Sequence, residues 1–128
     1  MKQIADNNFY SIAVDEGKNR MYLAVKGFWK DAGQVSEYLN DFKKALKFVS
    51  KGYSVVSDLT DMKTPSQEIG SLHVEAQQLL VNAGLKKTAE IHPASTITQI
   101  SLKRFSEESG MKKGLFRTKE EAEQWLDA

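Results

Sequence analysis

Short strand-like runs alternate with segments of helical periodicity along this chain, and that alternation is its most constraining feature. Residues 9–14 and 20–25 alternate large and small side chains around a turn-forming segment at 15–19, which predicts a β-hairpin. Further strand-like runs at 53–59, 88–92 and 115–116 are separated by amphipathic segments. This order, ββαβαβαβα, predicts an α/β fold with a mostly parallel mixed sheet, an N-terminal β-hairpin and helices packed on the sheet.

The first two helices are predicted from their caps and their apolar spacing. Asp31 can cap a helix that has Gln34 as its reciprocal partner and that continues to Gly52, where a left-handed residue can end it. Residues 64–67 predict the start of the next helix, with Thr64 as the cap and a proline in the first helical position.

Two further helices are predicted in the C-terminal half. The third begins at Ser95 or Thr96 and ends near Gly110. Its inner face is predicted to carry Ile97, Ile100, Arg104 and Phe105. A capping box at residues 118–121 opens the fourth helix, which is expected to pack Ala122, Trp125 and Leu126 inward.

Composition limits the class of protein. At 128 residues, with 41% hydrophobic and 27% charged side chains, the chain predicts one globular domain spanning 1–128. The formal net charge of +1 gives no basic surplus, and basic pairs stand near acidic residues, so nucleic acid is not an expected partner. The absence of cysteine fits a reducing compartment, and no apolar run approaches the length of a membrane span, so we expect a cytoplasmic protein.

No motif in the sequence predicts catalysis. The two histidines, His73 and His92, lack the further ligands and the spacing of a zinc site. There is no Gly-x-Ser-x-Gly turn for a nucleophilic serine, and the eight glycines form no phosphate-binding loop. We therefore expect a protein that is not an enzyme, with no catalytic residue, no metal and no cofactor.

Two segments carry a family resemblance. Residues 55–62 read Val-Val-Ser-Asp-Leu-Thr-Asp-Met, and residues 110–122 join a Gly-Met-Lys-Lys-Gly-Leu-Phe run to the last capping box. Together with the order of elements, they resemble the anti-sigma-factor antagonist (STAS) family, including its sporulation-antagonist-like, STAS/SEC14-type branch that is grouped with lipid-carrier folds. The resemblance covers nearly the whole chain, and it implies the family fold and a regulatory or docking role without catalysis.

The chain departs from this family where many members carry a phosphorylated serine. In those members the serine lies in an Asp-Ser-x-Gly turn at the start of the helix after the central strand, whereas residues 66–70 here read Ser-Gln-Glu-Ile-Gly. Ser66 and Ser71 are the substitute candidates for phosphorylation. Serine near a helix start is more commonly a cap or a solvated hydroxyl, which is the alternative at both positions.

The expected partner-binding surface follows the central strand. Ligands of parallel sheets collect at the carboxyl ends of strands, and backbone donors at a helix N-terminus can bind a carboxylate or phosphate of a partner. The residues predicted to form this surface are Asp58, Thr60, Asp61, Thr64, Ser66 and Ser71. The alternative is that Asp58 accepts backbone hydrogen bonds within its loop while Asp61 faces water.

Two functions from different classes are compatible with these features. The first is a non-enzymatic regulatory or protein-docking module of the anti-sigma-antagonist type. The alternative is a carrier or sensor of a small apolar, lipid-like ligand, held between helix and sheet near Leu72, Leu79 and Phe105, although core packing explains the same residues. Phe28 and Trp29 cannot both point into one face of a strand, so one of them is expected to pack over the sheet edge or the first helix. Packing in the core or at the edge is the favoured interpretation of the pair. The alternative is that an exposed member anchors a partner or a second subunit, which leaves a homodimer open.

Overall fold

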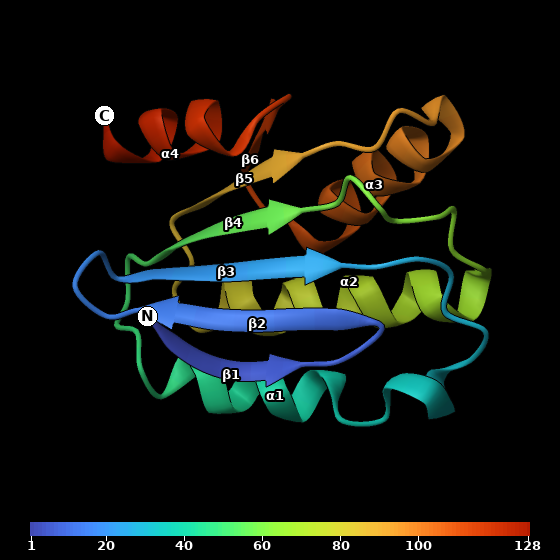
Figure 1. Ribbon diagram of the computed structural model, residues 1–128, viewed down its shortest axis with the longest axis horizontal. Coiled ribbons are helices and arrows are strands. Elements are labelled where there is room, and N and C mark those ends of the chain that lie inside the picture. The colour runs from blue at the N-terminus through green and yellow to red at the C-terminus, as the bar shows by residue number, and fades with distance from the viewer.

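A six-stranded mixed sheet forms the centre of the computed structural model, which describes all 128 residues (Figure 1). The strands are β1 (Lys2–Asp6), β2 (Tyr10–Asp15), β3 (Arg20–Val25), β4 (Ser54–Asp58), β5 (Lys87–Ile91) and β6 (Lys113–Phe116). They lie side by side in chain order. The first three are antiparallel, and β3 to β6 are parallel, so the predicted α/β class is confirmed.

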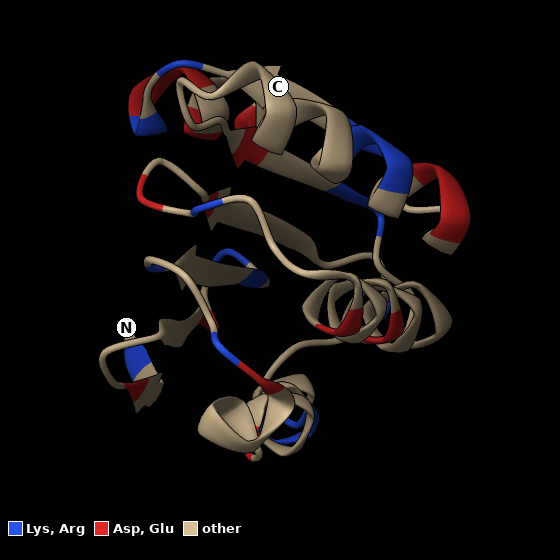
Figure 2. Ribbon diagram, turned by 90° about the vertical axis from the view of Figure 1, so that its right-hand side faces the viewer, with Lys and Arg blue, Asp and Glu red and all other residues tan.

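Helices cover the two faces of the sheet unequally (Figures 1 and 2). The short 3-10 helix η1 (Ala32–Val35), α1 (Tyr38–Leu46), α2 (Gln67–Asn82) and α3 (Thr96–Ser109) lie on one face, and α4 (Lys119–Asp127) lies on the other. Parallel crossovers are right-handed, and the strands β3 to β6 are added in one direction. The three connecting helices therefore stay on the same side.

Side chains that alternate along the strands contribute to two separate hydrophobic cores, one on each face of the sheet. Ile12, Met21 and Val55 point toward α1, α2 and α3 and belong to the main core, whereas Val56 and Ala89 point toward α4 and form a smaller cluster with Ala122. The main core contains a chain of aromatic contacts that runs from Tyr10 through Trp29, Tyr38 and His73 to Phe105. These rings pack α1, α2 and α3 against one another on this face of the sheet.

A buried arginine links α4 to the sheet. The guanidinium of Arg20, a residue that is 4% exposed, donates to Glu123 at 2.7 Å and to Asp127 at 2.9 Å. The Arg20 Nε also donates to the Ser54 hydroxyl at 3.0 Å. Planar guanidinium groups suit such multiple contacts, so this arginine fixes the orientation of α4 across β3 and β4.

The sequence analysis did not predict β1. Its residues Lys2–Asp6 pair with β2 across a register shift between Gln3 and Ala5. Most of these side chains are exposed, and the strand has only one large apolar residue beyond Met1. An edge strand of this kind lacks the alternation of polar and apolar residues on which the prediction of strands depends.

The predicted cap at Asp31 is confirmed, since its carboxylate accepts from the Gln34 N–H at 3.1 Å, but the helix predicted to continue from there to Gly52 is wrong. Asp31 opens the 3-10 helix η1, and a separate helix, α1, follows Glu37, whose φ of −96° and ψ of 4° lie outside the helical region, and ends at Leu46. The predicted start of the second helix is also wrong. The second helix is capped by Ser66, whose hydroxyl accepts from the Ile69 N–H, rather than by Thr64. The caps Ser95 and Thr118 are confirmed.

The predicted inner face of α3 is also largely wrong. Ile97 and Ile100 are 68% and 62% exposed, and Arg104 is exposed as well, whereas Phe105 is buried as predicted. The inner positions carry Thr98, Ser101 and Leu102 in addition. α2 and α3 approach closely at Gly70 of α2, where an added Cβ would lie 3.0 Å from the ring of Phe105 on α3.

Trp29 packs in the core, whereas Phe28 is exposed, which was the alternative for one member of this pair. Phe28 is 55% exposed, and Trp29 is 2% exposed. The indole N–H of Trp29 donates to the carbonyls of Phe9 and Lys26 at 3.1 and 3.2 Å, so its one polar atom is satisfied where it is buried.

Candidate functional site

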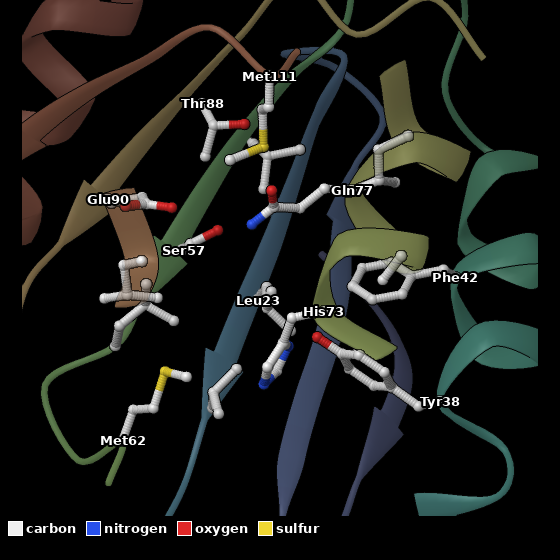
Figure 3. Close-up of a pocket in the computed structure, with 16 residues that line it drawn as sticks. Leu23, Tyr38, Phe42, Ser57, Met62, His73, Gln77, Thr88, Glu90 and Met111 are labelled. Atoms are coloured by element: carbon white, nitrogen blue, oxygen red, sulfur yellow. The ribbon is translucent and has the colours of Figure 1, made fainter. Parts of the chain in front are cut away.

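A small cavity lies between α2, α3 and the sheet, with a volume of about 30 Å³ (Figure 3). A water-sized occupant needs roughly 10–15 Å³ on this measure, so the cavity has room for one or two atoms of that size. Strand residues form its floor, α2 forms one wall, and Leu102 and Met111 contribute from α3 and the loop after it. The apolar side chains around it are Leu23, Val25, Tyr38, Phe42, Val55, Leu59, Met62, Ala76, Leu80, Leu102 and Met111.

Five polar side chains interrupt this apolar lining: Ser57, His73, Gln77, Thr88 and Glu90. Two of their atoms, His73 Nε2 and Thr88 Oγ1, are buried and have no hydrogen-bond partner in the protein. Buried polar atoms are nearly always paired, because leaving one unpaired costs about 1–3 kcal/mol. Both atoms therefore lack a hydrogen-bond partner that a buried polar atom normally has, and both residues line the same cavity.

His73 is held neutral by its surroundings. Its ring lies 5.0 Å from the ring of Trp29, 5.8 Å from Tyr38 and 5.9 Å from Phe105, measured between centroids. Burial among these rings lowers the pKa of His73 to about 4. A neutral imidazole offers one donor and one acceptor, so His73 can bind a neutral hydrogen-bonding group without carrying charge into the cavity.

Glu90 also lines the cavity, and its negative charge is paired with Lys113. Its Oε1 accepts from Lys113 Nζ and also contacts His92 Nε2, each at 2.8 Å, and the Glu90 side chain is 2% exposed. Lys113 donates in addition to the carbonyl of Leu102 at 3.0 Å. The polar end of the cavity is thus built from a paired carboxylate and the Thr88 hydroxyl on β5.

Two methionines stand at opposite ends of the cavity. Met62 lies in the loop after β4, and Met111 lies in the loop between α3 and β6 (Figure 3). Methionine side chains are unbranched and adopt many shapes, so they can move aside at low cost for a larger occupant. A larger occupant would therefore meet a flexible side chain at each end of the cavity.

The predicted partner-binding residues lie outside this cavity, at the carboxyl edge of β4 and the start of α2. Asp58 Oδ1 accepts from the Thr60 N–H at 3.1 Å and from the Thr60 hydroxyl at 2.7 Å, which is the local loop contact given as the alternative. The Asp61 side chain is exposed. Thr64 shares a hydrogen bond of 2.6 Å with Thr98 at the start of α3.

The two candidate phosphorylation sites differ in their surroundings. The Ser66 hydroxyl is engaged as the cap of α2, accepting from Ile69 N–H at 3.3 Å. Ser71 is exposed and lines a polar groove of about 410 Å³ between α2 and α3, together with Arg104 and Glu108. Of the two, Ser71 is the hydroxyl that a modifying enzyme could reach without breaking a helix cap.

The sequence analysis missed the polar residues of the cavity. A signal for His73 exists, since it shares the inward face of α2 with Ile69, Ala76 and Leu80 at helical spacing. Thr88 and Glu90 also share one face of a strand that is buried on both sides. The apolar residues predicted to line a pocket, Leu72, Leu79 and Phe105, do not line this one.

Two further findings concern metal binding and membrane insertion. No group of three or more histidine, aspartate or glutamate side chains lies close enough together to hold a metal ion. None of the helices combines the length and the apolar character needed to cross a membrane.

Comparison with known proteins identifies no relative. The chain matches no protein-family model and no curated protein sequence. The resemblance to the anti-sigma-factor antagonist family therefore stays a prediction.

Proposed function

We propose that this protein is a non-catalytic domain that binds a small, largely apolar molecule in the cavity between α2, α3 and the sheet. The observation that carries the proposal is the pair of unpartnered buried atoms, His73 Nε2 and Thr88 Oγ1, in an otherwise apolar enclosure. Ligand sites are typically apolar enclosures with a few polar groups that orient the ligand. The cysteine-free sequence and the family resemblance support a cytoplasmic carrier or sensor as the role of such a domain.

The lining also suggests the chemistry of the ligand. The neutral His73 and the Thr88 hydroxyl favour a hydroxyl or another neutral hydrogen-bonding group, and the carboxylate of Glu90 disfavours a second carboxylate nearby. A six-carbon chain is larger than the cavity of about 30 Å³, so its binding requires Met62 and Met111 to move aside. A short alcohol is therefore a better probe than the corresponding acid.

A nuclear magnetic resonance titration with 1-hexanol tests this proposal, with hexanoate as the matched probe. We expect saturable shifts of the Thr88 and Leu80 signals with hexanol and weaker shifts with hexanoate. In an Ala76→Leu variant, whose larger side chain fills the cavity, the hexanol shifts should disappear, whereas Ala94→Leu at an exposed loop position should keep them. Shifts that are equal in both variants would rule out binding in this cavity.

A Thr88→Val substitution separates the hydroxyl from the shape of the side chain. Because the hydroxyl has no partner, its removal should raise the free energy of unfolding by about 1–2 kcal/mol in the ligand-free protein and weaken hexanol binding. Urea denaturation measures the first effect. The exposed Thr96→Val is the matched control and should change stability by less than about 0.5 kcal/mol. A loss of stability in Thr88→Val would mean that the hydroxyl is bonded.

Docking of a protein at the start of α2 is a second candidate function. It is favoured by the hydrogen bond between Thr64 and Thr98, which joins the loop before α2 to the first turn of α3 and holds that edge of the sheet in one conformation. Replacing Asp61 and Ser71 with alanine should abolish the capture of a specific partner while leaving stability unchanged. Unaltered capture by this double variant would remove the surface from consideration.

A further inference from the structure

Four of the polar side chains that line the cavity gather at one end of it. Ser57 on β4 and Glu90 on β5 are direct neighbours in the sheet, and Gln77 reaches the same end from α2 (Figure 3). Thr88, two residues before Glu90, lies on the same face of β5. His73 lies further along the cavity, among the aromatic rings. The head group of a bound molecule would therefore meet several hydrogen-bonding groups at once at this polar end.

Glu90 presents one free carboxylate oxygen at the polar end. Its Oε1 accepts from Lys113 Nζ and contacts His92 Nε2, each at 2.8 Å, whereas its Oε2 has no hydrogen-bond partner in the protein. A carboxylate oxygen accepts hydrogen bonds and donates none. Because Lys113 already compensates the charge of Glu90, a neutral donor suits Oε2, whereas a cationic ligand would add an unpaired buried charge.

Gln77 presents the complementary donor. The Ser109 hydroxyl lies 2.7 Å from Gln77 Oε1 and 3.3 Å from the carbonyl oxygen of Ser106, so its single proton goes to the closer acceptor. This hydrogen bond fixes the orientation of the amide group. It leaves Gln77 Nε2, which points toward Ser57 in the cavity, without a partner in the protein (Figure 3). A carbonyl oxygen of a ligand is the group that matches this nitrogen.

Two hydroxyl groups complete the polar end. The Thr88 hydroxyl is buried without a partner, and the hydroxyl of Ser57, a residue that is 5% exposed, makes no hydrogen bond to another group of the protein. Each hydroxyl can donate or accept. A head group with two donors can therefore pair with Glu90 Oε2 and with one of these hydroxyl oxygens at the same time.

A primary amide matches this set of groups better than other small head groups. Its carbonyl oxygen can accept from Gln77 Nε2, while its two N–H groups can donate to Glu90 Oε2 and to a hydroxyl of Ser57 or Thr88. An alcohol has only one donor, and a ketone has none. A carboxylate would bring a second negative charge close to Glu90.

We propose that the polar end of the cavity recognises the primary amide group of an aliphatic ligand, with Gln77 binding its carbonyl oxygen and Glu90 binding its N–H group. This specificity rests on the proposed function, because it assigns the head group of the molecule that the cavity binds. The alkyl chain extends from the polar end along the apolar lining toward Met62 (Figure 3). A chain longer than the cavity displaces the flexible side chains of Met62 and Met111.

Nuclear magnetic resonance titrations with hexanamide, methyl pentyl ketone and hexanoate test this specificity. The three molecules have the same alkyl chain and the same number of non-hydrogen atoms, so they differ only in the head group. We expect hexanamide to bind about tenfold more tightly than the ketone, which leaves Glu90 Oε2 unpaired. Hexanoate should bind more weakly than the ketone because of its charge. With its single donor, 1-hexanol should fall between hexanamide and the ketone.

A Gln77→Leu variant assigns the carbonyl contact to this residue. It should bind hexanamide and the ketone about tenfold more weakly, because leucine has no donor for their carbonyl oxygen. The loss for 1-hexanol should be less than about threefold, since its hydroxyl can pair with Glu90 and Ser57 instead. The control Gln78→Leu makes the same change at the next, exposed position of α2 and should change binding less than about twofold. Thermal unfolding checks that both variants fold, and the ligand series on the wild-type protein decides the specificity if Gln77→Leu does not.

Three results would contradict the proposed specificity. If 1-hexanol or the ketone binds more tightly than hexanamide, and the Ala76→Leu variant binds none of them, the cavity remains the ligand site but its head group is not an amide. Equal weakening of hexanamide binding by Gln77→Leu and Gln78→Leu would exclude Gln77 as the carbonyl donor. If none of the four probes binds to the wild-type protein, the proposed function fails together with this specificity.

Discussion

A Glu90→Leu variant is expected to lose about 3 kcal/mol or more of its free energy of unfolding. The substitution removes the carboxylate that accepts from Lys113 Nζ at 2.8 Å, and it leaves an ammonium group on a side chain that is 11% exposed without its counter-charge. Removing one partner of a buried ion pair costs about 3–5 kcal/mol, because the remaining charge is desolvated and unpaired. Urea denaturation at neutral pH measures the loss.

The double variant Glu90→Leu with Lys113→Met is the control for this prediction. Replacing a buried ion pair by apolar side chains of similar volume is often close to neutral, so the double variant should recover most of the stability that the single variant loses. A single variant that loses less than about 1 kcal/mol would mean that Lys113 reaches solvent when its partner is removed.

Acidification from pH 6.5 to pH 4 should cost the wild-type protein about 3 kcal/mol through His73 alone. Burial lowers the pKa of His73 to about 4 in the folded protein, against 6.5 for an ordinary histidine. In this interval the unfolded chain binds a proton that the folded protein does not bind. The contribution of His73 to stability is therefore fully present above pH 6.5 and falls as the pH is lowered.

Comparison with a His73→Gln variant isolates the effect of His73, because every other titratable group is common to the two proteins. Unfolding free energies are measured by urea denaturation at half-unit steps of pH for both proteins. The wild-type curve should be steeper than the variant curve between pH 6.5 and 4, while the two should run parallel above pH 7. Parallel curves throughout would mean that the pKa of His73 is the same in the folded and the unfolded protein.

Elements with a strong local signal could be predicted from the sequence. The hairpin of β2 and β3 is bounded by turn-forming residues, and Ser95 and Thr118 cap their helices because the hydroxyl-bearing residue and the helix it opens are neighbours in the chain. Gly110, at φ 77°, ends α3 in the left-handed conformation that glycine adopts readily. These features depend on contacts within a few residues.

Features that depend on tertiary contacts could not be predicted in the same way. Thr64 has the sequence context of a cap, but Thr98 of another helix accepts or donates the hydrogen bond instead. The inward face of α3 carries small hydroxyl residues because α2 lies so close, and a count of apolar residues selects the outer face.

The polar residues of the cavity could not be predicted from the sequence either, because they too depend on tertiary contacts. His73, Thr88 and Glu90 come from α2 and β5, and their significance lies in what surrounds them rather than in their spacing. Asp58 lies at the end of the central strand β4 as expected, since strand ends can be inferred from the sequence, whereas the binding of a partner by residues 58 to 71 stays a prediction. The local role of Asp58 in its own loop was among the alternatives that the sequence left open.

The matching order of the strands in chain and sheet has a consequence for biosynthesis. Each strand pairs with the strand synthesised just before it. Each new strand that leaves the ribosome therefore finds its neighbour in the sheet already synthesised, and the sheet can form from β1 toward β6. The contact of Arg20 with Glu123 and Asp127 is an exception, because it joins residues more than a hundred positions apart. Glu123 and Asp127 must be synthesised before these contacts can form. Until translation is nearly complete, the guanidinium of Arg20 is therefore hydrated rather than paired.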